Sequence, residues 1–116
     1  MEIITVSAED LKDEIEHSSN LTVVNVLTKE YFDDCHIKGS INAPLDQLKT
    51  IASEWDKNRK LIVYCASYTC TASKTAHSIL TEMGFKNVRL YEGGTKEWKE
   101  KNYNRVGRCK KDCLKK

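Results

Sequence analysis

The chain has 116 residues, 40% of them hydrophobic and 31% charged, with a formal net charge of +2. This length supports one domain with a single core, and no run approaches the roughly 18 apolar residues of a membrane span. The first 20 residues contain acidic side chains and no apolar segment typical of a signal peptide. Composition and length therefore favour a soluble, cytoplasmic globular domain with no membrane partner.

The first half of the chain alternates predicted strands with predicted helices. Residues 3–6 predict a short strand, and Ser7 is a suitable N-cap for a helix that ends near Asn20. Residues 21–27 are almost continuously apolar, which indicates a strand buried on both faces. After a polar connection, apolar residues at helical spacing predict a helix over residues 45–55.

The second half continues the alternation. Residues 61–65 predict a buried strand that ends at Cys65, and a helix is expected from Ser73 to Met83. Gly84 is a suitable C-cap, residues 87–91 predict a last strand, and a turn leads into a short helix. Strands that alternate with helices at this spacing predict an α/β fold with a largely parallel sheet.

Cys65 is the strongest candidate nucleophile, because it follows a buried strand and precedes a helix N-terminus. Free backbone N–H groups and the helix dipole at such a place stabilise an anion. The thiolate is the reactive form of cysteine. The alternative is that Cys65 has only a structural role, since cysteine is often buried as a small hydrophobic residue.

Three segments together resemble the rhodanese-like domain, a family of single-domain sulfurtransferases. Residues 31–44 (YFDDCHIKGSINAP) are similar to the family signature Glu-Tyr-x-x-Gly-His-Ile-x-Gly-Ala-Ile-Asn-x-Pro. The second segment is the strand with Cys65 and the loop after it. Residues 84–98 (GFKNVRLYEGGTKEW) are similar to the family ending Gly-(Phe or Tyr)-x-x-Val…Gly-Gly-x-x-x-Trp. The match spans residues 3 to 104.

The resemblance implies a three-layer α/β fold with a central, mostly parallel sheet of about five strands and helices on both faces. Residues 1–104 would form this domain, and residues 105–116 a basic, flexible C-terminal tail. The resemblance also implies that Cys65 attacks a sulfane-sulfur donor, becomes a persulfide, and passes the outer sulfur to a thiolate or cyanide. The expected partners are a small sulfur donor and a thiol acceptor, with a protein persulfide or thiol as suitable as thiosulfate. No nucleic-acid partner, metal or organic cofactor is expected.

The loop after Cys65 is the expected substrate-binding segment, because its N–H groups can converge on anionic sulfur. It comprises Ala66, Ser67, Tyr68, Thr69, Cys70, Thr71, Ala72 and Ser73. Ser73 is expected to cap the helix. The loop departs from the common family pattern Cys-x-x-Gly-x-Arg, since it contains neither Arg nor Lys. We therefore expect weak binding of thiosulfate, a dianion that a guanidinium binds well.

Cys70 leaves two roles open. It can resolve a persulfide or protect Cys65 from over-oxidation as a redox partner, or it can pack beneath the loop as a small hydrophobic residue. One alternative function is accordingly a dithiol redox enzyme, or an arsenate-reductase-like or phosphatase-like enzyme, that uses Cys65 and Cys70. The other alternative is a non-catalytic rhodanese-like binding module.

The remaining cysteines are expected to be reduced, because no export signal is visible. Cys109 and Cys113 are too few to complete a four-ligand zinc site. Cys35 is not expected to act with His36, since neighbouring residues of an extended segment point to opposite sides. Residues 99–116 carry a net charge of +6 and the first 98 residues −4, and we expect this basic segment to be solvated.

Overall fold

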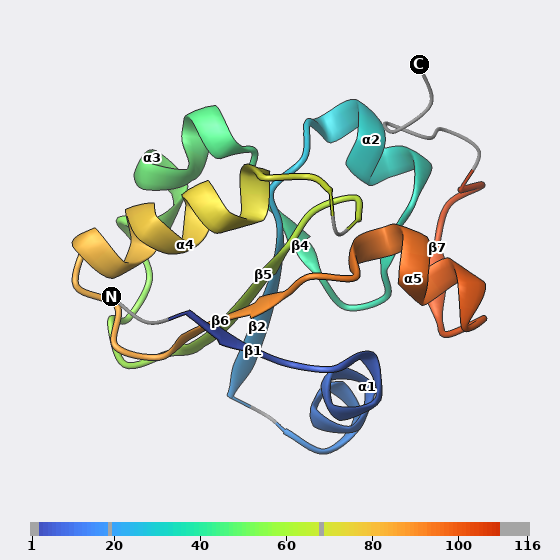
Figure 1. Ribbon diagram of the computed structural model, residues 1–116. Coiled ribbons are helices and arrows are strands. Elements are labelled where there is room, and N and C mark those ends of the chain that lie inside the picture. Colours follow the sequence, from blue (N-terminus) through green and yellow to red (C-terminus); the bar gives the residue numbers. More distant parts are fainter. Residues whose placement is uncertain (1–2, 19, 68, 110–116) are drawn as a thin grey trace.

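The core of the protein is a five-stranded sheet. The computed structural model describes residues 3–18, 20–67 and 69–109. The strands lie in the order β1-β6-β5-β2-β4, and every neighbouring pair is parallel (Figure 1). Their bounds are β1 Ile4–Thr5, β2 Leu21–Asn25, β4 Ile41–Asn42, β5 Lys60–Tyr64 and β6 Val88–Tyr91. The predicted α/β fold with a parallel sheet of about five strands is confirmed.

Helices cover both faces of this sheet (Figure 1). Their bounds are α1 Ala8–His17, α2 Lys29–Asp34, α3 Leu48–Ala52, α4 Ala72–Glu82 and α5 Gly94–Glu100. Helices α3 and α4 share one hydrophobic cluster with the sheet, and α1 and α5 share the other. None of the described helices is long and apolar enough to cross a membrane.

The alternation of side chains along the strands explains both clusters. In β5, Leu61 and Val63 face α3 and α4, whereas Ile62 and Tyr64 face α1 and α5. Because successive side chains of a strand point to opposite faces, a strand with helices on both sides must be apolar at nearly every position. Each of these four side chains is fully buried. This strand therefore sits at the centre of the molecule and holds whatever follows it in a fixed position.

The helices differ from the sequence-based expectations in two places. The helix predicted over residues 45–55 is a 3-10 turn, Leu45–Gln47, followed by α3, which ends at Ala52. The polar connection before it contains α2, a short helix that the sequence pattern did not indicate. An ion pair between Lys29 and Asp33 spans one turn of α2. The predicted N-cap is confirmed, since Ser7 Oγ accepts a hydrogen bond from Asp10 N at 3.1 Å.

The segment after residue 104 corrects two expectations. Strand β7 (Arg105–Val106) pairs antiparallel with β3 (His36–Ile37), and Cys109 forms a disulfide with Cys35. Residues 105–109 therefore belong to the folded domain rather than to a tail. The expectation that the cysteines are all reduced is wrong for this pair, because sequence context gave no sign that residues 74 positions apart lie side by side. Residues 110–116, with Cys113, lie outside the described residues.

Candidate active site

Cys65 directly follows β5, at the carboxyl end of a strand in the middle of the sheet. Its side chain is 1% exposed and belongs to the cluster between the sheet and helices α3 and α4. Helix α4 begins at Ala72, so a loop of seven residues, 65–71, joins the strand to the helix. The expected strand-end position of Cys65 is confirmed. Ligands of open α/β sheets bind at this edge, outside the carboxyl ends of the strands.

Ser73 faces the sulfur of Cys65 from the first turn of α4. The Ser73 Oγ atom lies 3.4 Å from Cys65 Sγ. Hydrogen bonds from the Ser73 hydroxyl and backbone N–H stabilise a Cys65 thiolate and act to lower the pKa of that thiol. The prediction that Ser73 caps α4 is wrong, since the N-cap is Thr71 and its side chain makes no capping hydrogen bond. Ser73 is instead part of the environment of the sulfur.

Cys70 returns to the same place from the far end of the loop. A turn closed by the hydrogen bond from Cys70 N to Ser67 O, 3.1 Å long, folds the chain back over Cys65. Cys65 Sγ donates to the carbonyl oxygen of Cys70 at 3.4 Å. The Cys70 side chain is half-buried against the cluster that contains Cys65. Both thiols are free, so the loop brings two reduced sulfurs into one site.

The two thiols shift each other's pKa. Their mutual hydrogen bond, helped by the N–H groups of Ala66 and Ala72, lowers the pKa of Cys70 to about 5. The same hydrogen bond and burial raise the pKa of Cys65 above its ordinary value. The hydrogen bond between the thiols therefore favours a negative charge on the more exposed sulfur of Cys70 over one on Cys65.

The hydroxyl groups within the loop brace its backbone. Ser67 Oγ lies 3.1 Å from Thr69 Oγ1, and Thr69 N donates to Ser67 Oγ at 3.4 Å. Ser67 is buried, whereas Thr69 and Thr71 are exposed. Tyr68, also predicted in this loop, lies outside the described residues. Ser67 and Thr69 thus maintain the turn that carries Cys70 back to Cys65.

The start of α5 anchors the backbone at Cys65. The N–H groups of Thr95 and Lys96 donate to the carbonyl oxygens of Cys65 and Ala66 at 3.1 and 2.9 Å. Gly94 makes this approach possible, since its φ is +66° and an added Cβ would lie 2.5 Å from the Cys65 oxygen. The sequence alone did not indicate this contact, although the Gly93-Gly94 pair was the available signal.

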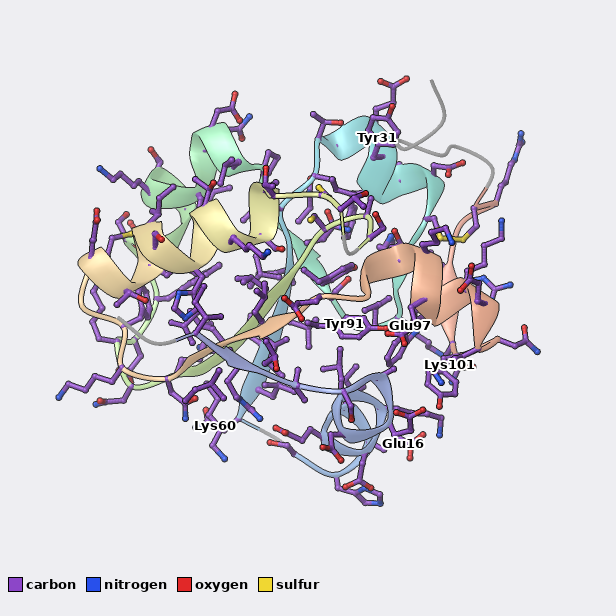
Figure 2. All side chains as sticks on the ribbon, in the orientation of Figure 1. Glu16, Tyr31, Lys60, Tyr91, Glu97 and Lys101 are labelled. Carbon is purple, nitrogen blue, oxygen red and sulfur yellow. A yellow bond between two sulfur atoms is a disulfide. The ribbon has the colours of Figure 1, made fainter. Side chains whose placement is uncertain are left out.

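Tyr91 fixes α5 to the end of β6. Its hydroxyl donates to Glu97 Oε1 at 2.8 Å, and Figure 2 shows the two side chains side by side. Tyr91 is 1% exposed and Trp98 packs against its ring edge-on, with the ring centroids 5.8 Å apart. The helix that holds the Cys65 backbone is therefore itself held by a buried aromatic contact and a hydrogen bond to a carboxylate.

A comparison with protein families identifies the family to which this architecture belongs. The model of the Rhodanese-like domain matches residues 7–101, which include every strand of the central sheet except β1, together with Cys65, its loop and α5. The chain belongs to the rhodanese-like domain family. The predicted resemblance is confirmed over most of the chain.

Curated relatives of this rhodanese-like domain are distant. The Bacillus subtilis protein YrkF is 25% identical over 93 residues, which cover 80% of this chain and 49% of YrkF. The chain thus spans about half the length of that relative. The thiosulfate sulfurtransferase GlpE of Shewanella oneidensis is 29% identical over 85 residues, which cover 73% of this chain and 82% of GlpE.

Solved structures agree with the fold. The rhodanese-like domain of the Alr3790 protein from Anabaena sp. has a TM-score of 0.83 and 26% identity, and the match covers 100% of this chain and 87% of that domain. A rhodanese from E. coli, solved with anions, has a TM-score of 0.62 and 32% identity over 75% of this chain and 98% of its own. The three-layer architecture is therefore shared with rhodanese-like domains of known structure.

Proposed function

We propose that this rhodanese-like domain is a sulfurtransferase that carries sulfane sulfur as a persulfide on Cys65. The observation that carries the proposal is the position of Cys65 at the carboxyl end of β5, with the hydroxyl and N–H of Ser73 beside its sulfur. Donors aimed at a sulfur anion stabilise both the attacking thiolate and the persulfide that replaces it. The relation to the thiosulfate sulfurtransferase GlpE supports the same chemistry.

Loading starts from the Cys65 thiolate, which hydrogen bonds from the Ser73 hydroxyl and backbone N–H stabilise. The Cys65 thiolate then attacks the outer sulfur of a persulfide donor. A bond forms between Cys65 Sγ and that sulfur, the sulfur–sulfur bond of the donor breaks, and its electron pair leaves on the donor thiolate. An acceptor thiolate removes the outer sulfur from Cys65 by the same displacement.

A persulfide is a better donor for this loop than thiosulfate. Residues 65–73 contain no Lys or Arg that could neutralise a dianion. The N–H groups of Ala66 and Ala72 are already directed at the negative charge of Cys70. A second anion with two charges meets repulsion from Cys70 and finds no guanidinium to offset it. We therefore expect a low-molecular-weight or protein persulfide to load Cys65 faster than thiosulfate does.

Intact mass spectrometry of the Cys70→Ser protein tests the proposal. This variant keeps Cys65 as the only loop thiol, so a persulfide formed there has no neighbouring thiol to react with. Without reductant, brief incubation with glutathione persulfide should add one sulfur atom, and peptide mapping should locate that atom on Cys65. The Cys65→Ser protein should gain none, and Cys113→Ser serves as a control for thiol removal outside the loop.

The other outcomes contradict the proposal. Sulfur found on Cys70 of the Cys65→Ser protein at an undiminished rate would exclude Cys65 as the nucleophile. The absence of loading in the wild-type and Cys70→Ser proteins, with glutathione persulfide and with thiosulfate, would favour a non-catalytic binding module.

A further inference from the structure

The loop contains a second sulfur nucleophile that the proposed sulfur transfer through Cys65 does not consume. Cys70 lies against Cys65 because the turn at Ser67 folds the loop back, and Cys65 Sγ reaches the Cys70 carbonyl oxygen at 3.4 Å. The Cys70 side chain also packs against the cluster that contains Cys65. The loop therefore holds the two free thiols in one site.

The position and exposure of Cys70 make it the attacking member of the pair once Cys65 is modified. Cys70 is half-buried whereas Cys65 is 1% exposed, and the N–H groups of Ala66 and Ala72 stabilise its thiolate. In the unmodified pair, the hydrogen bond from Cys65 lowers the pKa of Cys70, and these N–H groups lower it further. An adjacent thiolate of low pKa is the form that attacks a sulfur–sulfur bond.

The other described cysteines do not compete for this reaction. Cys35 and Cys109 are bonded to each other, so neither offers a thiol. Within residues 3–18, 20–67 and 69–109, Cys65 and Cys70 are therefore the two free thiols. Their separation of five residues lies within one loop, and Ser67 and Thr69 brace the turn that brings them together.

We propose that Cys70 is a resolving cysteine that reductively releases the sulfur carried by Cys65 as hydrosulfide. This inference rests on the proposed persulfide at Cys65. The Cys70 thiolate attacks the inner sulfur, Sγ of Cys65. A Cys65–Cys70 disulfide forms, the bond from Cys65 Sγ to the outer sulfur breaks, and its electron pair and the persulfide proton leave as hydrosulfide.

A dithiol reductant completes the cycle. Its two thiols supply two electrons and two protons to the Cys65–Cys70 disulfide, and the reductant leaves as its own disulfide. One turn therefore converts a persulfide donor and a dithiol into a thiol, hydrosulfide and an oxidised dithiol. The site then acts as a sulfane-sulfur reductase, a different outcome from transfer of the intact sulfur to an external acceptor.

The test uses the full chain in a Cys113→Ser background, with and without Cys70→Ser. Each protein is loaded anaerobically with one equivalent of glutathione persulfide, desalted at once, and followed with a fluorogenic hydrosulfide probe and non-reducing intact mass. The Cys70-containing protein should release one hydrosulfide per chain and lose two hydrogens, with the Cys65 and Cys70 peptides linked. The Cys70→Ser protein should retain the added sulfur and release none.

Turnover gives a second readout. With excess donor and dithiothreitol, the Cys70-containing protein should produce hydrosulfide at least tenfold faster than Cys70→Ser, and thermal unfolding of both should establish that the variant is folded. Stable sulfur on Cys65 without hydrosulfide release in the Cys70-containing protein would overturn this inference and leave sulfur transfer intact. No loading in either protein would instead overturn the proposed function on which the inference rests.

Discussion

The two cysteine pairs of this domain are built in opposite ways. Cys35 and Cys109 are 74 residues apart, and the pairing of β3 with β7 brings them together as a disulfide. Cys65 and Cys70 are neighbours in one loop, yet they remain thiols, surrounded by N–H donors and the Ser73 hydroxyl. Proximity in sequence therefore does not decide which pair is bonded, because the backbone around each pair determines whether the sulfurs form a bond or share a proton.

A glycine packs closely against a backbone carbonyl group beside each cysteine pair. Gly94 lies against the Cys65 and Ala66 carbonyls, and Gly107 lies against the carbonyl of Asp34, next to Cys35. Both glycines have positive φ, +66° and +102°. Cys35 and Cys109 therefore cross-link the domain and Cys65 and Cys70 remain free thiols, although a glycine of positive φ packs against the backbone beside each pair.

The largest expected effect comes from opening the bonded pair. The Cys35→Ser/Cys109→Ser protein should lose about 4 kcal/mol of unfolding free energy, because the disulfide closes a long loop in the unfolded chain. Urea denaturation measures the loss, and sulfur loading of Cys65 at low denaturant should be unchanged. A matching loss of loading would mean that the two pairs are not independent.

Gly94→Ala should disturb the position of Cys65 and slow its loading with sulfur. A Cβ at φ +66° and 2.5 Å from the Cys65 oxygen should cost about 1–3 kcal/mol and displace the Cys65 backbone. The rate of sulfur loading should fall at least tenfold. Gly107→Ala is the matched control, since it strains a similar position beside Cys35 and should lower stability without slowing the loading. Equal loading rates in the two variants would show that the contact of α5 with the Cys65 backbone is not needed for sulfur loading.

The thiolate of the free pair should persist in mild acid. Because the pKa of Cys70 is lowered to about 5, its alkylation by iodoacetamide should be independent of pH above that value. Below it, the rate should fall about tenfold per pH unit, as for any group that must be deprotonated. Peptide mapping assigns the modified residue. A midpoint near that of an ordinary thiol would show that no charge is shared.

The same ionisation predicts how stability depends on pH. The lowered pKa means that Cys70 releases its proton on folding between about pH 5 and the ordinary thiol range. The unfolded chain binds more protons there, so the stability of the wild type relative to Cys70→Ser should rise with pH. That advantage should be lost as the pH falls through about 5. Denaturation of both proteins across this range measures it.

The smallest effect is expected at Ser73. Ser73→Ala removes a hydroxyl 3.4 Å from Cys65 Sγ but keeps the backbone N–H that also faces the sulfur. The loss of one hydrogen bond of about 1 kcal/mol should slow sulfur loading about fivefold. Ser78→Ala changes an exposed hydroxyl on the same helix and should leave the rate unaltered. A Ser73→Ala rate equal to that control would reduce Ser73 to a structural role.

Local patterns predicted the architecture and the position of Cys65. The apolar run from Leu61 to Tyr64 is long enough for one strand and apolar on both faces, so burial in the middle of a parallel sheet follows from its residues alone. The small polar residues after Cys65 cannot continue that packing, which places the cysteine at the strand end. These signals involve neighbours in the chain, and the structure agrees with them.

Only the tertiary structure decided what surrounds each sulfur. Cys35 meets Cys109 because β7 returns to β3, and α5 holds the Cys65 backbone because Gly94 allows close approach. Ser73 faces Cys65 rather than capping α4, since the N-cap of α4 is Thr71, two residues earlier. Such contacts depend on where the chain returns in space and on which atoms a turn directs inward. Hydrophobic periodicity carries neither piece of information, so the sequence determined the fold and the candidate nucleophile, and packing determined its partners.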